Sequence, residues 1–291
     1  MCHRINGKKR FLIPEALSWE KKSVLRNYVW GVRLEIVEYG FDMRTGQLDI
    51  ADLRSKFDGN VTGIYAEVPN FFGVIDPQVL SLRDTFSETA LVIGVNPLSL
   101  GVLRAPGDYS ADIVVGEGQV LGSPMNFGGP LLGIFAARQE HVRKMPGRVI
   151  GMTRDAEGNR AFCMTLQTRE QHIRRSKATS NICTSEALMS LAAAVHLSMV
   201  GKEGLRDLGR SNMSRARRLM DAIGEIGGYE SPIFEAGHFN EFVIKPPIEP
   251  SRLNKHLLER GMIGGLPLDR HVSRLEGLQD AGPGRHGSLR G

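Results

Sequence analysis

The chain has 291 residues, which is long enough for one large domain or two modest ones. Hydrophobic residues make up 41% and charged residues 24%, as in ordinary soluble globular proteins, and every apolar run is interrupted well before about 20 residues, which excludes a membrane-spanning helix. The 37 basic and 32 acidic residues are interspersed, and no basic block alternates with aromatic residues, so the net charge of +5 predicts no nucleic-acid binding.

The N-terminus shows no targeting segment. MCHRINGKKR is basic, but the FLIPEAL that follows is too short and too soon broken by Pro14 and Glu15 for a signal peptide. The three cysteines, Cys2, Cys163 and Cys183, have neither pairing nor zinc-ligand spacing, and each is expected to be a small buried side chain. We therefore expect a cytoplasmic protein without a metal site.

Residues 11 to 115 alternate between strand and helix patterns. Strands are expected at FLIPEA (11–16), RLEIVEY (33–39), VTGIYAEV (61–68), ALVIGV (90–95) and ADIVVGE (111–117). Helices are expected at 18–30, 48–57 and 76–86, the first with Ser18 as N-cap and with Val24, Leu25, Tyr28 and Val29 on one side. Repeated units of this length predict a mostly parallel sheet with helices on both faces and right-handed crossovers.

Sites in such sheets lie beyond the carboxyl ends of the strands. Those ends lead here into VPNFFGVIDP (68–77), VNPLSLG (95–101) and GEGQVLGSPMNFGGP (116–130), loops rich in Pro, Gly and Asn. The glycine series at 116–133 could bring backbone N–H groups close to an anion, but it matches neither the Walker P-loop nor the dinucleotide fingerprint. A turn-rich connection to a strand at LLGIFAA (131–137) explains the glycines at least as well.

The second half of the chain changes character. RVIGMTRD and RAFCMTLQ, joined by the turn AEGN, predict a hairpin at 148–167. Two long helices are expected at 184–200 and 203–226, then strands at SPIFEA (231–236) and EFVIKP (241–246) and a helix at 251–260. This pattern predicts a large domain at 1–200, a small α/β domain at 201–270 and a disordered Gly- and Arg-rich tail at 271–291.

The most distinctive stretch is QTREQHIRRSKATSNICT, residues 167–184. A crowd of cationic and amide side chains ends in Thr179, Ser180 and Asn181, directly before an apolar helix. Hydroxyl, amide and helix-start N–H donors are suited to a phosphate. A solvated helix face could explain the charges, but not why the run ends in this Thr-Ser-Asn cluster. Thr179 could also simply be a helix-entry residue. His172 could act as a general acid or base, although a buried histidine bonded to the adjacent charges is the preferred interpretation.

Four motifs together carry a family resemblance. QTREQHIRRSKATSNICT, MPGRVIGMTRD (145–155), GEGQVLGSPMNFGGP and VPNFFGVIDP resemble the P-protein of the glycine cleavage system, in particular subunit 1 of its split, two-chain form, over roughly residues 11–268. The resemblance implies the fold of pyridoxal 5'-phosphate (PLP) enzymes of the aspartate-aminotransferase type. Such enzymes have a mostly parallel sheet flanked by helices and a smaller C-terminal α/β domain. The family decarboxylates glycine on PLP and passes the aminomethyl group to the lipoyl group of H-protein.

The resemblance also implies a division of labour between two subunits. The catalytic subunit has a Schiff-base lysine after the strand that corresponds to ADIVVGE, and an aspartate at the end of the preceding strand. The matching positions here hold Gln119 and Asn96, and no lysine lies between Lys56 and Lys144. The chain should then be the non-lysine subunit, without a catalytic residue of its own. PLP would be bound covalently by subunit 2, in a two-plus-two heterotetramer.

Related PLP enzymes donate a threonine across the dimer interface to the phosphate of the partner's cofactor. By that analogy Thr179 is the best candidate for the contact, with Ser180 and Asn181 beside it and Arg174 or Lys177 supplying charge. Lys177 is also a rival Schiff-base lysine, because the cations around it would favour its nucleophilic form. Pairing with a phosphate or carboxylate, or plain exposure to solvent, is the preferred interpretation of Lys177.

The chain departs from the family in two places. Subunit 1 has a substantial region before the part that matches Phe11 and a structured C-terminus where this chain continues, after GGLPLDRH, into its Gly- and Arg-rich segment. These differences suggest a truncated or frame-disrupted copy that lacks the family's N-terminal region. Two alternatives to an active subunit therefore stay open: a non-catalytic scaffold or remnant, and a stand-alone PLP aminotransferase or desulfurase relative, which would need its own Schiff-base lysine.

Overall fold

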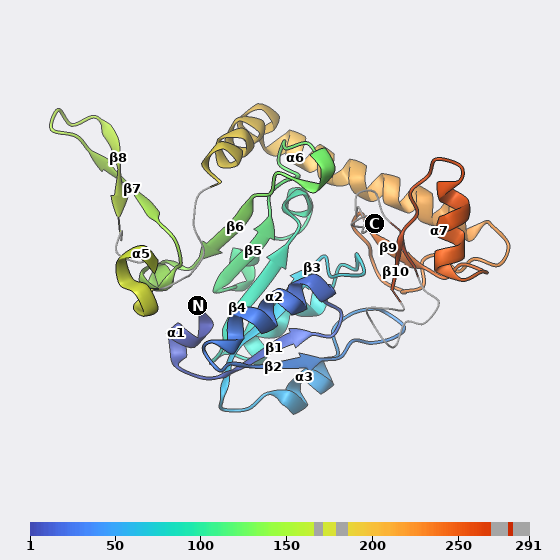
Figure 1. Ribbon diagram of the computed structural model, residues 1–291, viewed down its shortest axis with the longest axis horizontal. Helices are drawn as coiled ribbons and strands as arrows, with labels where there is room; N and C mark the ends of the chain where they lie inside the picture. Colours follow the sequence, from blue (N-terminus) through green and yellow to red (C-terminus); the bar gives the residue numbers. More distant parts are fainter. Residues whose placement is uncertain (166–170, 179–185, 269–278, 282–291) are drawn as a thin grey trace.

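A six-stranded sheet with the strand order β2-β1-β3-β4-β5-β6 forms the centre of the molecule (Figure 1). The structure is a computed structural model, and it describes residues 1–165, 171–178, 186–268 and 279–281. The strands are β1 (Arg10–Pro14), β2 (Glu35–Tyr39), β3 (Val61–Val68), β4 (Ala90–Val95), β5 (Ile113–Glu117) and β6 (Gly133–Ala137). The first five are parallel and β6 runs antiparallel to β5, so the predicted mostly parallel sheet is confirmed.

Helices cover both faces of this sheet, as predicted. α1 (Cys2–Asn6) and α2 (Trp19–Trp30) contribute to the core on one face, and α3 (Ile50–Lys56), η1 (Pro77–Ser81), α4 (Leu82–Thr85) and η3 (Pro106–Tyr109) to the core on the other. Ser18 is the N-cap of α2, and its side chain accepts a hydrogen bond from Lys21 N at 3.4 Å. The single helix predicted at 76–86 is instead the 3₁₀ turn η1 followed by the short α4.

The buried side of α2 differs from the prediction. Val24 and Tyr28 are exposed, whereas Lys22 and Leu25 face the sheet. The Lys22 ammonium group can lie there because it donates to Glu38 Oε2 on β2 at 2.6 Å, while its aliphatic stem is covered. Apolar periodicity missed this arrangement because it gives a lysine no place on an inner face.

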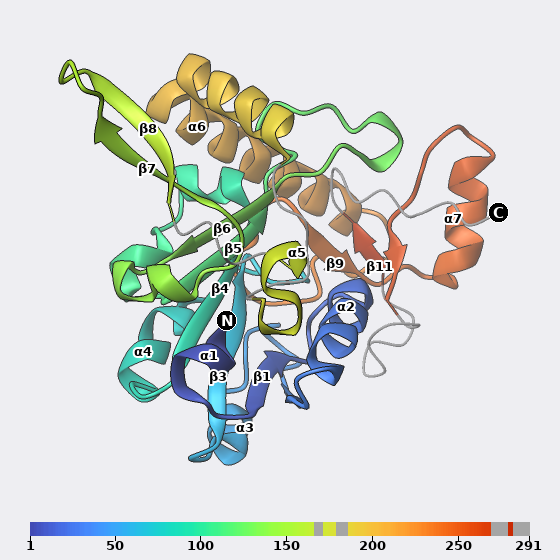
Figure 2. The same cartoon turned by 60° about the vertical axis from the view of Figure 1, so that its left-hand side comes forward.

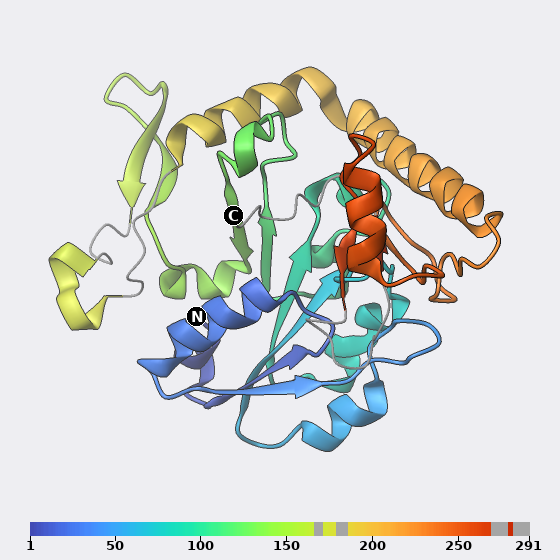
Figure 3. The ribbon, with the colours of Figure 1, turned by 45° about the vertical axis from the view of Figure 1, so that its right-hand side comes forward.

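The predicted hairpin is confirmed as β7 (Val149–Arg154) and β8 (Arg160–Thr165), a two-stranded sheet of its own that projects away from the central sheet (Figures 1 and 3). The remaining short elements of this region of the chain are η2 (Pro97–Gly101), η4 (Asn126–Gly128), η5 (Gln139–Lys144), α5 (Gln171–Arg174) and η6 (Arg175–Lys177).

The long helix α6 (Ala187–Gly224) crosses the top of the molecule in Figure 3. It is interrupted at Gly201, where φ is 63° and ψ is −175°, so it corresponds to the two successive helices predicted. Its second half packs closely on η2, since a Cβ atom at Gly101 would lie 2.3 Å from the Leu205 carbonyl oxygen. Neither α6 nor any other helix within the described ranges is long and apolar enough to cross a bilayer.

The C-terminal part contains β9 (Phe242–Ile244), α7 (Pro250–Leu258), β10 (Leu266–Pro267) and β11 (Gln279–Ala281), with the strands in the order β10-β11-β9. One prediction is wrong here: residues 231–236 form no strand, and Phe234 enters an aromatic core instead. Residues 279–281, within the segment predicted to be a disordered tail, form β11, the central strand of this antiparallel sheet. The rest of that segment lies outside the described residues, so the disordered tail stays a prediction. The domain boundary near residue 200 stays a prediction.

Candidate functional site

The carboxyl ends of β3, β4 and β5 are neighbours in the sheet, so their three loops start at one edge. The loop after β3 is held by Asn70, whose side-chain oxygen accepts from Phe72 N at 3.0 Å and Val74 N at 3.1 Å, and whose amide donates to Gly46 O at 2.8 Å. Phe71 and Phe72 are fully buried. The two phenylalanines of VPNFFGVIDP therefore pack in the core and are not available to a ligand.

This loop attaches the C-terminal part to the sheet. The ring of Phe72 lies 4.9 Å from that of Phe41 and 4.8 Å from that of Phe234. Gly73 has φ of +77°, and a Cβ atom there would lie 1.9 Å from the Glu241 carbonyl oxygen. Only glycine fits this crossing of two backbones.

The loop after β4 begins at Asn96, which caps η2. Its side-chain oxygen accepts a hydrogen bond from Leu98 N at 3.1 Å, and its carbonyl oxygen accepts from Ser99 Oγ at 2.7 Å. Asn96 is a neutral amide already used for local structure. It therefore has no charge with which to stabilise the protonated pyridine nitrogen of a PLP cofactor.

The loop after β5 is closed by its own hydrogen bonds. Glu117 Oε1 accepts from Gln119 N at 3.0 Å and from Leu132 N at 2.7 Å, and the Gln119 amide donates to Pro130 O at 2.9 Å. Gly122, with φ of +93°, packs against His196 of α6. These contacts favour the turn-rich interpretation of the glycine series.

This edge of the sheet does not fit a covalently bound PLP. The sequence has no lysine from residue 57 to residue 143. The two positions where the family resemblance expects a lysine and an aspartate hold the amides of Gln119 and Asn96, each engaged in a hydrogen bond. An amide nitrogen cannot replace the amine that such a cofactor needs. The chemistry of this edge is therefore that of a closed loop, and no catalytic step follows from it.

A buried ionic group lies beside this edge that the sequence did not predict. Glu67, at the end of β3, accepts a hydrogen bond from the Tyr65 hydroxyl at 2.6 Å and pairs with Lys21 of α2. Burial, and then the Glu67 charge, raise the pKa of Tyr65 well above its usual value. Gly94 makes room for the pair, since a Cβ atom there would lie 2.3 Å from the Tyr65 hydroxyl.

Only two of the five predicted phosphate-binding residues lie within the described part of the chain. Arg174 and Lys177 are exposed on α5 and η6, while Thr179, Ser180 and Asn181 lie outside the described residues. His172 is exposed, so the expectation of a buried histidine is wrong.

The position of α5 and η6 follows from α1. The Ala178 carbonyl accepts from Arg4 of α1. Helix α1 in turn lies beside β3 (Figure 2), and its Asn6 side chain donates to Thr62 O, near the start of that strand, at 3.0 Å. The cations of α5 and η6 are thus anchored near the amino end of β3, whereas Asn96 and Gln119 follow the carboxyl ends of β4 and β5. The structure does not join these two groups into one site on this chain.

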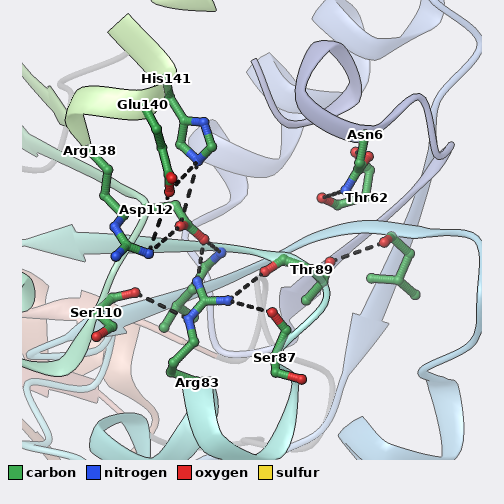
Figure 4. A network of polar contacts seen from close by, with 12 residues as sticks. Asn6, Thr62, Arg83, Ser87, Thr89, Ser110, Asp112, Arg138, Glu140 and His141 are labelled. Carbon is green, nitrogen blue, oxygen red and sulfur yellow. Dashed lines mark hydrogen bonds and ion pairs between the residues drawn. The ribbon is translucent and has the colours of Figure 1, made fainter.

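A polar network around Asp112, just before β5, was also not predicted from the sequence (Figure 4). The buried Asp112 carboxylate pairs with Arg83 and accepts from Leu91 N at 2.8 Å. Arg138 Nη1 lies 3.5 Å and His141 Nε2 lies 3.7 Å from its other oxygen. Local sequence patterns could not predict this network, because its residues lie far apart in the sequence and meet only through the crossovers between strands.

The same network includes three groups that could in principle hold a metal ion: Asp112, Glu140 and His141, with ligand atoms within 4.8 Å of one another. The guanidinium groups of Arg83 and Arg138 already neutralise Asp112. The cluster also lies at the amino end of β5, away from the edge where sites form in this kind of sheet. We assign it a structural role.

Comparisons with known proteins agree with this geometry. The family description "Glycine cleavage system P-protein" matches residues 1–277. A probable glycine dehydrogenase (decarboxylating) subunit 1 of Saccharolobus solfataricus is 48% identical over 278 residues, covering 94% of this chain and 61% of that protein. An inhibitor-bound crystal structure of glycine decarboxylase (P-protein) gives a TM-score of 0.87 at 34% identity, covering 100% of this chain and 64% of that one. A sphingosine-1-phosphate lyase of Burkholderia pseudomallei gives 0.64 at 15% identity, covering 96% and 60%, which shows the fold alone.

The sheet order, the two helical layers and these neighbours define the fold of PLP-dependent transferases, which confirms the predicted fold class. Within that fold, the match over residues 1–277 is specific, and the chain belongs to the glycine cleavage system P-protein family. It spans about 61% of the length of the Saccharolobus relative.

Proposed function

We propose that the chain is the non-lysine subunit of a two-chain glycine decarboxylase. Together with a lysine-bearing subunit 2, it would decarboxylate glycine on PLP and pass the aminomethyl group to lipoyl H-protein. Family membership supports the reaction, and one observation supports the subunit role: Gln119 stands where the amine would be required, with its amide bonded to Pro130 O at 2.9 Å.

The experiment compares this chain alone with the complex formed on co-expression with the lysine-bearing subunit. Glycine–bicarbonate exchange is measured with PLP and H-protein present, and PLP is fixed by borohydride and located by peptide mass spectrometry. We expect exchange from the complex only, with the modified lysine on the partner. Exchange by the purified single chain, with PLP reduced onto one of its own lysines such as Lys177, would refute the proposal and favour a stand-alone PLP enzyme.

We further propose that Arg174 and Lys177, with Thr179, Ser180 and Asn181, contact the phosphate of the partner's PLP. The support is chemical: two exposed cations with no hydrogen bond or ion pair to described side chains precede a run of hydroxyl and amide donors. The cofactor supplies the electron sink for decarboxylation. The role of this chain would be to neutralise and orient the phosphate.

Arg174→Gln, Lys177→Gln and Thr179→Ala, each in the complex, test this contact. Loss of one charge-assisted hydrogen bond should weaken PLP binding by roughly tenfold or more. Lys202→Gln, which removes an exposed cation from α6, is the matched control and should leave affinity unchanged. Unaltered PLP affinity and turnover in all the variants would favour the scaffold role.

A further inference from the structure

Within the described residues, the β7–β8 hairpin belongs to no larger sheet. Each strand pairs only with the other in a two-stranded sheet, which projects from the body of the molecule (Figure 1). A lone hairpin is at best marginally stable in water and needs a third strand or another packing surface. The described part of this chain contributes no further strand to that sheet.

One face of the hairpin carries the side chains that would contact such a surface. The pairs Ile150–Met164, Met152–Phe162 and Arg154–Arg160 lie opposite each other and, by the two-residue period of a strand, on the same face. Met152 is 73% and Phe162 is 65% exposed. The result is an apolar patch of two cross-strand pairs, with two arginines at the tip; we call it the hairpin face.

We propose that the hairpin face docks onto the lysine-bearing partner subunit. This inference rests on the proposed function and adds to it the surface by which the two chains associate. Permanent interfaces are more apolar than transient ones, whose partners leave the surface in water for part of the time. An exposed Met152–Phe162 pair on a hairpin of marginal stability suits a permanently bound subunit better than a carrier protein that binds transiently.

Charge separates this partner from a second copy of the same chain. From Arg143 to Lys177 the sequence has nine Lys and Arg against three Asp and Glu, an excess of six over a segment of a chain whose net charge is +5. A second copy docked through this segment would bring the same excess, which disfavours self-association. The occupant should therefore carry acidic groups beside an apolar patch.

The two arginines at the tip of the hairpin also favour an occupant with acidic groups. Arg154 and Arg160 face each other directly across the strands, an arrangement that destabilises a hairpin by itself. Arg154 donates to Gly158 O at 2.6 Å and Arg160 lies 6.0 Å from the ring of Phe162, but neither forms an ion pair with a carboxylate within the described ranges. A carboxylate on the partner would relieve the repulsion.

The test uses the co-expressed complex and surface-exposed positions. Met152→Asp places a charge on the hairpin face, and we expect association with the partner to weaken by roughly 30-fold or more, as for an interface hot spot. Arg154→Glu should weaken it too, and should invert the effect of salt on association. Thr153→Asp, exposed on the opposite face of β7, and Ile263→Asp, 73% exposed after α7, are the controls and should associate normally.

Light scattering of each purified chain and of the mixture separates the outcomes. Undiminished association of the Met152→Asp chain, with normal folding by circular dichroism, would overturn the docking proposal but leave the proposed function intact. A wild-type chain that dimerises alone, and loses this with Met152→Asp, would overturn it in favour of a second copy as the occupant. Loss of H-protein binding with an intact complex would overturn it in favour of the carrier. Failure of the wild-type chain to bind any lysine-bearing subunit would refute the proposed function itself.

Discussion

Gly73→Ala should detach the C-terminal part from the sheet. A left-handed φ of +77° costs an alanine about 1–2 kcal/mol, and its Cβ would lie 1.9 Å from the Glu241 carbonyl oxygen, far inside contact distance. The two backbones must move apart, which breaks the bonds from Phe239 N to Gly73 O and from Ile75 N to Gly237 O, at 3.0 and 2.7 Å. Each is worth about 1 kcal/mol, so we expect a loss of about 3–4 kcal/mol in the free energy of unfolding.

Equilibrium unfolding in urea, followed by circular dichroism, measures this loss. Gly7→Ala is the matched control, because Gly7 has nearly the same φ of +75° but no neighbouring group within 4 Å of the position that a Cβ atom would take. The control should lose only the conformational part, about 1–2 kcal/mol. Equal losses in the two variants would refute the reasoning, because they would mean that the close approach of Gly73 to Glu241 contributes nothing.

Three further outcomes follow from buried groups. Asp112→Ala leaves the guanidinium of Arg83 without its carboxylate partner and should lower the free energy of unfolding by about 3–5 kcal/mol in urea titrations, with Asp112→Asn losing less because it keeps an acceptor. Burial lowers the pKa of His238 from 6.5 to about 4, so its neutral form is favoured in the fold; stability should be full above pH 6.5 and fall towards pH 4, and His238→Gln should flatten that slope. Burial raises the pKa of Cys2 to about 11, so iodoacetamide should label the exposed Cys163 and spare Cys2, as read by peptide mass spectrometry of the folded chain.

The parallel strands were predictable because of where they lie. β3 and β4 are buried on both faces, so each reads in the sequence as a nearly continuous apolar run, 61–68 and 90–95, with turn residues on either side. The strand predicted at 231–236 fails for the opposite reason. Its apolar residue Phe234 packs on Phe72, which lies far away in the sequence, so local alternation says nothing about the contact.

The candidate site divides in the same way. That positions 119 and 96 hold neutral amides, and neither an amine nor a carboxylate, is a property of single side chains, and the sequence alone determined it. The network around Asp112, the crossing at Gly73 and the bare hairpin face depend on segments that meet only after the chain has folded. Side-chain identity is local, whereas burial, charge pairing and exposure are set by long-range contacts, and only the tertiary structure decided those.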